Sequence, residues 1–312
     1  MRVGVVFPGQ GSQTVGMGGA LAELPVAADL FQRARDLLGY DLLELIRNGP
    51  EEKLRETQFS QPAIYVVNYA LAVAAGEGLG VVASAGHSFG EFCSLTLAGA
   101  LTFEDALALV RERGLAMQDC AERAPGAMAA ILGLDAELLR EAVREARAHG
   151  RVSLANFNAP GQIVISGDRD AVAAAGERAM ARGAKRVVPL NVSGAWHSEL
   201  MLPARERFAP FVARATLVMP RFPVVSNVDA SPYTDVATIR TNLVRSVTDE
   251  VRWHATAERL VAQGLDLVVE FGGSAVLAPL FKRLEGAPKA LHVGDERGLA
   301  KLAETLGAES LA

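Results

Sequence analysis

A serine between two glycines is the sharpest chemical signal in the sequence. The run Gly86-His87-Ser88-Phe89-Gly90 matches G-x-S-x-G, the pattern that places a nucleophilic serine on a tight turn from a strand into a helix. Glycine permits such a turn. The hydroxyl of Ser88 would then stand beside free amide N–H groups at a helix N-terminus, which can stabilise an oxyanion. The plain alternative is a Gly-Ser turn without chemistry, and a strand before the run and a helix after it favour the nucleophile.

A serine needs a base to become a nucleophile, and the sequence contains five histidines. His197 lies in the small-residue loop 192–198, at a junction between predicted domains, which makes it the best candidate for the base. The side chain of His87 should point away from Ser88 in so sharp a turn. The remaining three are interpreted as solvated or structural: His149, His254 and His292.

Arg113 interrupts the apolar face of a predicted helix. Helical spacing places it on one stripe with Val110 and Met117. A buried arginine needs a partner, because an unpaired buried charge is costly. That partner could be an internal carboxylate, such as Glu91 or Glu104, or the carboxylate of a substrate held by the guanidinium fork.

Gln10 lies in a glycine-rich loop, Pro8–Gln13, directly after the first predicted strand. Flanking glycines let this backbone approach another loop closely, so the loop could supply a second amide N–H to an oxyanion. The Gly spacing fails the dinucleotide pattern G-x-G-x-x-G, and no Walker A sequence occurs. The sequence contains no cluster of histidines and cysteines that would indicate a structural metal site.

The elements around these residues alternate between strands and helices. Val3–Phe7 and Leu79–Ala85 are apolar runs typical of buried strands, and Phe89–Leu97 is apolar enough for a buried helix. This alternation predicts a parallel α/β sheet. Later segments continue it, with strands predicted at 223–226 and 267–271 and helices near 104–120, 199–214, 236–247, 253–263 and 275–284.

The middle of the chain has a different order, strand–helix–strand–strand–helix–strand. This order is that of the ferredoxin-like split unit. We therefore expect an α/β protein with a hydrolase-like large domain around a parallel sheet, formed by 1–124 and 191–312, and a small ferredoxin-like subdomain inserted at 125–190. The six small elements are predicted at 127–132, 136–149, 152–157, 162–166, 170–182 and 185–189.

Composition narrows the class of protein. Half of the 312 residues are hydrophobic and 21% are charged, which excludes a disordered chain. A net charge of −5 without a long basic run argues against nucleic-acid binding. The apolar stretch Ala63–Ala75 is too short to span a bilayer, and no signal peptide is recognised. Cys93 and Cys120 fit buried free thiols, so we expect a cytoplasmic protein.

Four motifs, in this order, resemble malonyl-CoA:acyl carrier protein transacylases, the stand-alone enzymes of fatty acid synthesis and the acyltransferases of polyketide synthases. The motifs are Phe7–Gln13, Gly86–Glu91, Arg113-Gly114 and the loop of His197. Further similarity occurs at 126–131, 156–162 and 227–229, so the resemblance covers nearly the whole chain.

The resemblance implies a ping-pong acyl transfer. Ser88 would attack the thioester of malonyl-CoA with His197 as base, and the amide N–H groups of Gln10 and Phe89 would hold the oxyanion. Arg113 would bind the malonyl carboxylate. The phosphopantetheine thiol of an acyl carrier protein would then take the acyl group. No bound cofactor is implied, since acyl-CoA and the carrier protein are substrates, and we assume a monomer.

Other features of the resemblance are less uniform. In this family a backbone carbonyl orients the histidine, and the matching position is Ser246. Phe89 stands where leucine is frequent. Trp196, beside the base, resembles trans-acting polyketide acyltransferases and should shrink the acyl pocket, so that α-branched units such as methylmalonyl are disfavoured. Asn158 and Gln162 would help to line the cleft.

Three alternatives remain open at this point. One is a trans-acting polyketide acyltransferase with a non-malonyl acyl unit. A second is a serine hydrolase or an editing hydrolase of the same fold, for which a buried Arg113 has no use. The third is a non-catalytic module that docks a carrier protein, in which Ser88 would be unreactive.

An acyl carrier protein is acidic, so a basic surface should receive it. Candidates on the small subdomain are Arg182, Lys185 and Arg186, and candidates on a late helix are Lys282 and Arg283. The plain alternative for each is ordinary surface solvation.

Overall fold

A five-stranded parallel sheet forms the centre of the larger lobe. The computed structural model describes residues 1–307, and the strand order is β7-β2-β1-β8-β9, with every neighbouring pair parallel. The strands are β1 Val3–Phe7, β2 Val81–Gly86, β7 Val224–Val225, β8 Leu267–Phe271 and β9 Lys289–Val293. The predicted parallel sheet is confirmed, and its carboxyl edge carries the loops after β1, β2 and β8.

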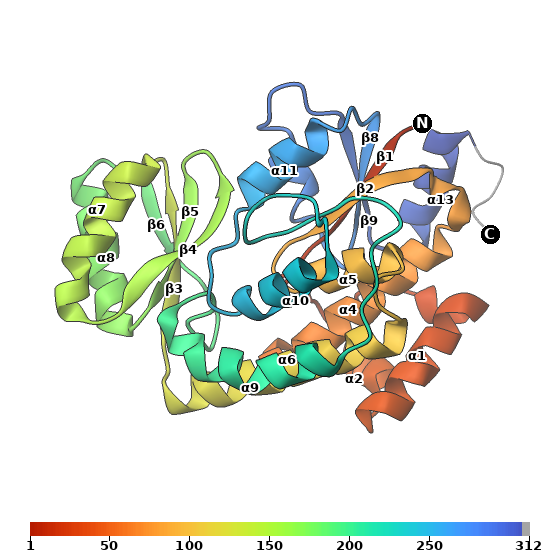
Figure 1. The fold of residues 1–312 in the computed structure, drawn as a ribbon, viewed down its shortest axis with the longest axis horizontal. Coiled ribbons are helices and arrows are strands. Elements are labelled where there is room, and N and C mark those ends of the chain that lie inside the picture. Colours follow the sequence, from red (N-terminus) through yellow and green to blue (C-terminus); the bar gives the residue numbers. More distant parts are fainter. Residues whose placement is uncertain (308–312) are drawn as a thin grey trace.

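Helices cover both faces of this sheet (Figure 1). Alternate residues of β1 enter different cores, because successive side chains of a strand point to opposite faces. Val5 and Phe7 join the core that contains α4 and α5, whereas Val6 joins the core built with Trp253 and Phe281. The helices of this lobe are α1 Pro25–Leu38, α2 Leu42–Asn48, α3 Glu51–Arg55, α4 Thr57–Ala74, α5 Gly90–Leu97, α6 Phe103–Arg123, α9 Leu202–Arg214, α10 Val236–Arg245, α11 Trp253–Val261, α12 Ala278–Phe281 and α13 Glu296–Leu306.

A second sheet forms the smaller lobe, at the left of Figure 1. Its order is β4-β5-β3-β6, and all its pairs are antiparallel. Helices α7 and α8 pack together and against the sheet, and share its hydrophobic core. The predicted order βαββαβ is confirmed in the elements β3 Ala127–Leu132, α7 Ala136–Ala146, β4 Val152–Ala159, β5 Gln162–Gly167, α8 Arg169–Ala181 and β6 Arg186–Pro189. The predicted limits 125–190 enclose all six.

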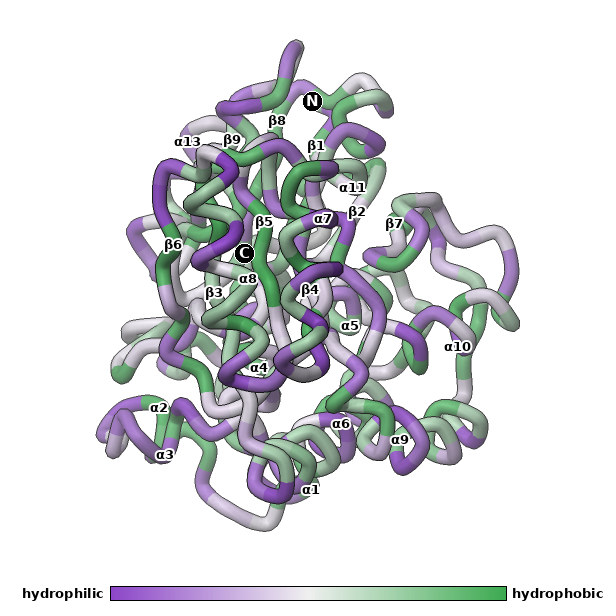
Figure 2. The backbone as a smooth tube through the Cα atoms, turned by 90° about the vertical axis from the view of Figure 1, so that its left-hand side faces the viewer, coloured by the Kyte–Doolittle hydropathy of each residue, from purple (hydrophilic) through white to green (hydrophobic). Residues whose placement is uncertain are grey.

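The two lobes are joined by backbone hydrogen bonds as well as by the chain. Phe157 N, on β4, donates to Val251 O at 2.8 Å, and Val251 N donates to Ala155 O at 2.8 Å. Val251 lies just before α11 of the large lobe, and α11 packs against β4. Figure 2, which faces the small lobe, shows hydrophobic residues along the strands of both sheets. The small sheet is therefore fastened to the large lobe at one defined edge.

Two elements near the C-terminus were not predicted, and one helix is shorter than expected. The strand β9 and the helix α13 were missed. The helix expected at 275–284 is reduced to α12, because the buried carboxylate of Glu270 accepts hydrogen bonds from the amides of Val276, Leu277 and Ala278 at 2.8–2.9 Å. These bonds hold the preceding residues in a loop, and that loop forms one wall of the pocket described below.

Candidate active site

Ser88 lies at the tight turn between β2 and α5, in the left-handed region with φ 54°. Both flanking glycines are required by close approaches. A Cβ added at Gly86 would lie 1.9 Å from the carbonyl carbon of Gly90, and a Cβ at Gly90 would lie 2.4 Å from the carbonyl oxygen of Phe7. Such backbone strain persists only where the surroundings enforce it, and it is concentrated at functional sites. The turn therefore has the geometry of a nucleophile elbow.

The structure brings His197 to Ser88 from more than a hundred residues away in the chain. The Oγ of Ser88 lies 2.9 Å from Nε2 of His197, and both residues are buried. On the other side of the ring, Nδ1 donates to the backbone carbonyl of Asp249 at 3.1 Å. A carbonyl can only accept, so Nδ1 carries the proton and Nε2 is left with a lone pair facing the hydroxyl.

The backbone carbonyl that bonds Nδ1 of His197 is that of Asp249, and the carbonyl of Ser246, the predicted one, acts on the same ring. Helix α10 ends at Arg245, but the chain keeps turning, with Asp249 N bonded to Arg245 O at 2.8 Å. The carbonyl that reaches the imidazole most closely is therefore that of Asp249. The carbonyls of Asp249 and Ser246 both raise the pKa of His197, and that of Ser246 does so less strongly. Arg245 also fixes Asp249 through its side chain, Nε to Oδ2 at 2.8 Å.

His197 is a neutral imidazole at ordinary pH. Burial lowers its pKa to about 3, and the positive charge of Arg113 contributes in the same direction. Burial disfavours the protonated form, because a charge is poorly solvated in a protein interior. A neutral ring with a free Nε2 lone pair is the state that a general base requires.

Arg113 lies on α6 with 1% of its surface exposed, and it has no carboxylate partner among the described residues. Its Nη1 donates to Oε1 of Gln61 at 2.9 Å and its Nη2 to Oγ of Ser88 at 3.3 Å, while Nε has no partner. Burial lowers its pKa to about 10, so it stays protonated near neutrality. A positive charge thus stands beside the serine without a carboxylate bonded to it, and the nearest internal negative charge to act on it is the more distant Glu91.

The two internal carboxylates considered for Arg113 are engaged elsewhere. Glu104 pairs with Arg33. Glu91 is buried and accepts hydrogen bonds from Asn227 and from the hydroxyl of Tyr233. The structural alternative for Arg113 therefore loses its partners, and a ligand carboxylate becomes the natural counter-charge.

The glycine loop after β1 lies against the elbow. A Cβ added at Gly9 would lie 2.6 Å from the carbonyl oxygen of His87 and 3.5 Å from Cβ of Ser88. Within residues 1–307, neither the amide of Gln10 nor that of Phe89 donates a hydrogen bond. Two free N–H groups on loops that meet at the serine are the elements of an oxyanion hole.

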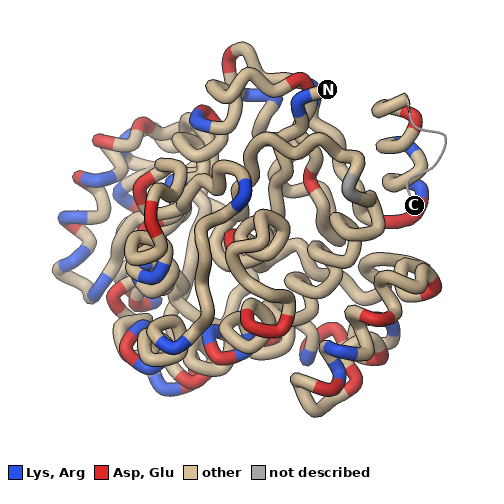
Figure 3. Tube along the Cα trace, turned by 45° about the vertical axis from the view of Figure 1, so that its right-hand side comes forward, with Lys and Arg blue, Asp and Glu red and all other residues tan. Residues whose placement is uncertain are grey.

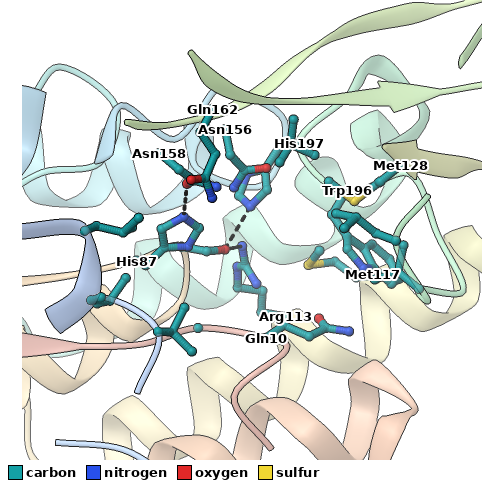
Figure 4. A pocket seen from close by; sticks show the side chains of 18 residues that line it. Gln10, His87, Arg113, Met117, Met128, Asn156, Asn158, Gln162, Trp196 and His197 are labelled. Atoms are coloured by element: carbon teal, nitrogen blue, oxygen red, sulfur yellow. Dashed lines mark hydrogen bonds between the residues drawn. The ribbon is translucent and has the colours of Figure 1, made fainter. Parts of the chain in front are cut away.

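These residues line one cavity of about 200 Å³ between the two lobes (Figure 4). Its floor is formed by Ser88, Arg113 and His197. One wall is apolar, with Met117, Met128 and Trp196 grouped together. The small lobe contributes polar side chains and the loop before α12 contributes apolar ones: Asn156, Asn158 and Gln162, and Val276, Leu277 and Leu280. The cavity is mixed in polarity, and Ser88 is among the residues that line it.

Several residues that hold the site together were not predicted. Asn227 clamps the elbow, since its Oδ1 accepts from Ser88 N at 3.1 Å and its Nδ2 donates to Ser88 O at 3.2 Å. Glu91 in turn holds Asn227. His87 bonds Oδ1 of Asn158 through Nε2 at 2.9 Å, across the two lobes. Residues 227–229 belong to the segments that resemble the family, but nothing in the sequence indicates a bond from Asn227 to the serine backbone.

The five basic residues proposed for docking fall into two groups. Arg182 is paired with Glu145 at 2.6 Å, and Lys185 and Arg186 follow it on the small lobe, exposed. Lys282 and Arg283 follow α12, also exposed, and Nη1 of Arg283 donates to Oε1 of Gln162 at 2.8 Å. Because Gln162 lines the cavity, only the second group is tied directly to its rim.

Two further findings bear on the class of protein. Among the side chains that the structure describes, no three histidine, cysteine, aspartate or glutamate residues gather in a way that could hold a metal ion. None of the helices described is both long and apolar enough to cross a membrane.

Fold and site together are those of an α/β protein with a candidate active site, formed by a serine–histidine pair beside a buried arginine. Comparison with known proteins specifies the family. Residues 5–289 match the acyl transferase domain family, and the chain belongs to it.

Similar curated proteins include malonyl CoA-acyl carrier protein transacylases of several bacteria. The chain is 42% identical to the malonyl CoA-acyl carrier protein transacylase of Haemophilus influenzae, over 94% of this chain and 96% of that protein. It is 40% identical to the transacylase of the same name from Bacillus subtilis, over 99% and 98%.

Solved structures agree in fold over nearly the full length. A type II polyketide synthase acyl-carrier protein in complex with its malonyl-transacylase matches with a TM-score of 0.94 and 40% identity, covering 98% of this chain and 100% of that one. An acyl carrier protein S-malonyltransferase from Vibrio cholerae matches with a TM-score of 0.91 and 39% identity, covering 97% and 100%.

Proposed function

We propose that the protein is an [acyl-carrier-protein] S-malonyltransferase. It moves a malonyl group from CoA to the phosphopantetheine thiol of an acyl carrier protein, for fatty acid or polyketide synthesis. The observation that carries this proposal is the buried guanidinium of Arg113, which lacks a carboxylate partner and donates to Oγ of Ser88. Relatives named as malonyl transacylases, over nearly the whole chain, support it.

In the first half-reaction Ser88 becomes acylated. His197 Nε2 takes the proton of the Ser88 hydroxyl as Oγ attacks the thioester carbonyl. The oxyanion that forms is held by the amide N–H groups of Gln10 and Phe89. When the intermediate collapses, the C–S bond breaks, and the imidazolium returns its proton to the sulfur of CoA. The malonyl carboxylate is meanwhile held by Arg113.

The second half-reaction uses the same groups in reverse order. CoA leaves, and the phosphopantetheine thiol of a carrier protein enters the cavity. His197 takes the thiol proton, the sulfur attacks the acyl-serine carbonyl, and the Ser88 Oγ leaves with a proton from the imidazolium. The carbonyl of Asp249 keeps the ring in the tautomer that both steps need. Nothing is oxidised or reduced, so no redox cofactor is required.

Arg113 distinguishes this proposal from hydrolysis. A lipase-like or editing hydrolase that releases neutral acyl chains gains nothing from a buried cation at the acyl group, and it would carry the burial penalty without a return. A dicarboxylic acyl unit supplies the missing negative charge. The same argument disfavours a module that only docks carrier proteins, since docking needs no charge beneath the surface.

We propose that Trp196 selects against α-branched acyl units. Its ring packs over Gly194, where an added Cβ would lie 2.5 Å from the ring, and Met117 and Met128 lie on the same wall of the cavity. The ring is therefore held in place beside the catalytic histidine. One methyl group is worth about 1–3 kcal/mol in such a pocket, so the preference for malonyl over methylmalonyl is partial.

We propose that the carrier protein docks at Lys282 and Arg283, with Arg186, Lys185 and Arg182 as a more distant contribution. Arg283 is bonded to Gln162 at the cavity, so an acidic partner there would stand where its prosthetic arm can enter. Basic and acidic residues are interspersed along the outer helices in Figure 3. Because no broad basic face is visible in that view, we propose that the docking surface is a small cluster of basic residues.

We further propose that the enzyme acts as a monomer in the cytoplasm, without a bound cofactor. A single chain supplies every group of the site described above, and Cys93 and Cys120 are buried free thiols, as expected in a reducing compartment. Light scattering of the purified protein tests the monomer.

The experiment that tests the proposed function is intact-mass spectrometry after mixing with a panel of acyl-CoAs. Malonyl-CoA is expected to give one acyl adduct, which the thiol of a holo carrier protein removes and an apo carrier protein does not. The Ser88→Ala protein should give none. Absence of an adduct on the wild-type protein, or release of free malonate in place of transfer, would overturn the proposal.

A further inference from the structure

A chain of buried polar side chains runs beneath the site, between α4 and α6. Thr57 and Gln61 lie on the first turns of α4 with 0% of their surface exposed. The two helices approach closely here, because residue 114, next to Arg113, is a glycine, and a Cβ there would lie 2.9 Å from the carbonyl oxygen of Thr57. Buried polar groups of this kind need a reason, since each must be desolvated.

The hydrogen bonds in this chain have a single consistent direction. Arg113 Nη1 donates to Oε1 of Gln61 at 2.9 Å, and Nε2 of Gln61 donates to Oγ1 of Thr57 at 2.8 Å. The hydroxyl of Thr57 then donates to Oε1 of Gln10 at 3.0 Å. The side-chain amide of Gln61 is therefore used at both ends, as an acceptor toward the arginine and as a donor toward the threonine.

A carboxylate would be the ordinary partner for a buried arginine, and Gln61 has nearly the shape of one. The difference is its charge. An amide oxygen holds the guanidinium in place without neutralising it, whereas a glutamate at the same position would form a complete ion pair. A glutamate would also lack the N–H that Thr57 accepts, so the hydroxyl of Thr57 would turn toward the carboxylate and release Gln10.

We infer that Gln61 is the residue that sets selectivity for a carboxylate-bearing acyl group, by positioning Arg113 while leaving its charge free, and that Thr57 links this arginine to the loop of Gln10. The inference rests on the proposed function, in which Arg113 meets the acyl carboxylate and the Gln10 amide meets the oxyanion. One hydrogen-bond chain thereby joins recognition of the acyl group's far end to stabilisation of charge at its carbonyl. Gln61 and Thr57 act through other residues and are positioning residues.

The central test is the Gln61→Glu protein, which differs from the wild type by one atom type and one charge. We expect the ratio of kcat/KM for malonyl-CoA to that for acetyl-CoA to fall by roughly 100-fold, because the new carboxylate occupies Arg113. A matched control is Gln58→Glu, one turn earlier on α4, where the amide bonds Glu56 and not the arginine. A ratio in Gln61→Glu equal to that of the Gln58→Glu control would overturn the inference.

A binding measurement separates this inference from the proposed function. In a Ser88→Ala background, calorimetry with malonyl-CoA and acetyl-CoA reports the binding preference without any transfer. The preference for malonyl-CoA should be lost when Gln61→Glu is added. If the wild type loads neither acyl group, the proposed function fails, whereas loss of the binding preference would still support the role of Gln61. An undiminished preference for malonyl-CoA in the double variant would refute that role.

Further variants remain informative if Gln61→Glu does not fold. Gln61→Met keeps the charge of Arg113 free but removes its support, so the KM for malonyl-CoA should rise about tenfold with little change in kcat. Thr57→Val breaks the link to Gln10, and should lower kcat for both acyl groups several-fold with their ratio unchanged. Thr57→Ser restores the hydroxyl and should restore the rate. Unaltered kinetics in Gln61→Met and Thr57→Val would overturn the inference.

Discussion

Replacing Arg113 with alanine tests the central electrostatic feature of the site. The side chain is almost fully buried and reaches Ser88, yet no carboxylate among the described side chains bonds it. If the carboxylate of the malonyl group is its missing partner, Arg113→Ala removes one half of a buried ion pair that forms only when substrate is bound. Loading of malonyl-CoA should then fall far more than loading of acetyl-CoA, which has no carboxylate to lose.

The magnitude follows from the number of donors available. Nε has no partner, and Nη2 is held only by a 3.3 Å bond to Ser88, so two N–H groups can turn to a carboxylate. A hydrogen bond to a charged group contributes about 1.5–3 kcal/mol. Two such bonds give about 3–6 kcal/mol, or roughly 10²–10⁴-fold in kcat/KM at about 1.4 kcal/mol per decade.

The assay is rapid mixing with malonyl-CoA or acetyl-CoA, followed by quantification of the acyl-enzyme. Arg111→Ala is the matched control, since Arg111 lies on the same helix, is partly exposed and pairs with Glu112. The quantity to compare is the malonyl-to-acetyl ratio, because Arg113 also bonds Ser88 and its loss can slow both reactions. A ratio unchanged from the Arg111→Ala control would refute the assignment of Arg113.

Three further predictions concern the base, the acyl wall and the docking surface. Because burial lowers the pKa of His197 to about 3, kcat/KM for malonyl-CoA should stay level as pH falls from 8 to about 5; half-loss near pH 6.5, the ordinary value, would contradict a buried neutral base. Trp196→Ala should raise methylmalonyl loading relative to malonyl loading by roughly tenfold, and equal ratios in variant and wild type would remove Trp196 from selectivity. Arg283→Glu should raise the KM for carrier protein, with weaker salt dependence, whereas Arg182→Glu, at a residue paired with Glu145 and bonded to the carbonyl of Arg178, should do so less. Equal effects of the two reversals would place docking elsewhere.

Local patterns in the sequence predict most of the fold and the first groups of the site. The turn at Ser88 is recognisable because its glycine spacing is local, although only Gly86 is required by a contact within the turn, with Gly90, whereas Gly90 is required by Phe7, far away in the sequence. The small lobe is recognisable because each of its elements keeps its own periodicity of apolar residues. Strand β9 was missed since it lies at a sheet edge, where its residues are unevenly buried and alternation is weak.

Features that depend on the exact path of the chain were not within reach of the sequence. The carbonyl of Asp249, and not mainly that of Ser246, accepts the hydrogen bond from Nδ1 of His197, because the chain continues in a turn from Arg245 to Asp249 after α10 ends. The residue types do not reveal this turn. Glu270 is a single acid inside an apolar strand, and nothing in the sequence indicates that its carboxylate accepts from the amides of Val276, Leu277 and Ala278 beside the cavity. Thr57 and Gln61 are four residues apart, hence on one helical face, and that spacing of polar residues before an apolar run was an available signal.

The seam between the lobes also bears on how substrates enter. Val251, which exchanges backbone bonds with β4, lies two residues beyond Asp249, whose carbonyl aligns the imidazole. An outward rotation of the small sheet at Val251 would move the carbonyl of Asp249 away from His197. The imidazole would then lose the hydrogen bond that sets its tautomer. We therefore expect the distance between the two lobes to stay constant throughout turnover. The phosphopantetheine groups of CoA and of the carrier protein would then enter a cavity that is already open, without closure of one lobe onto the other.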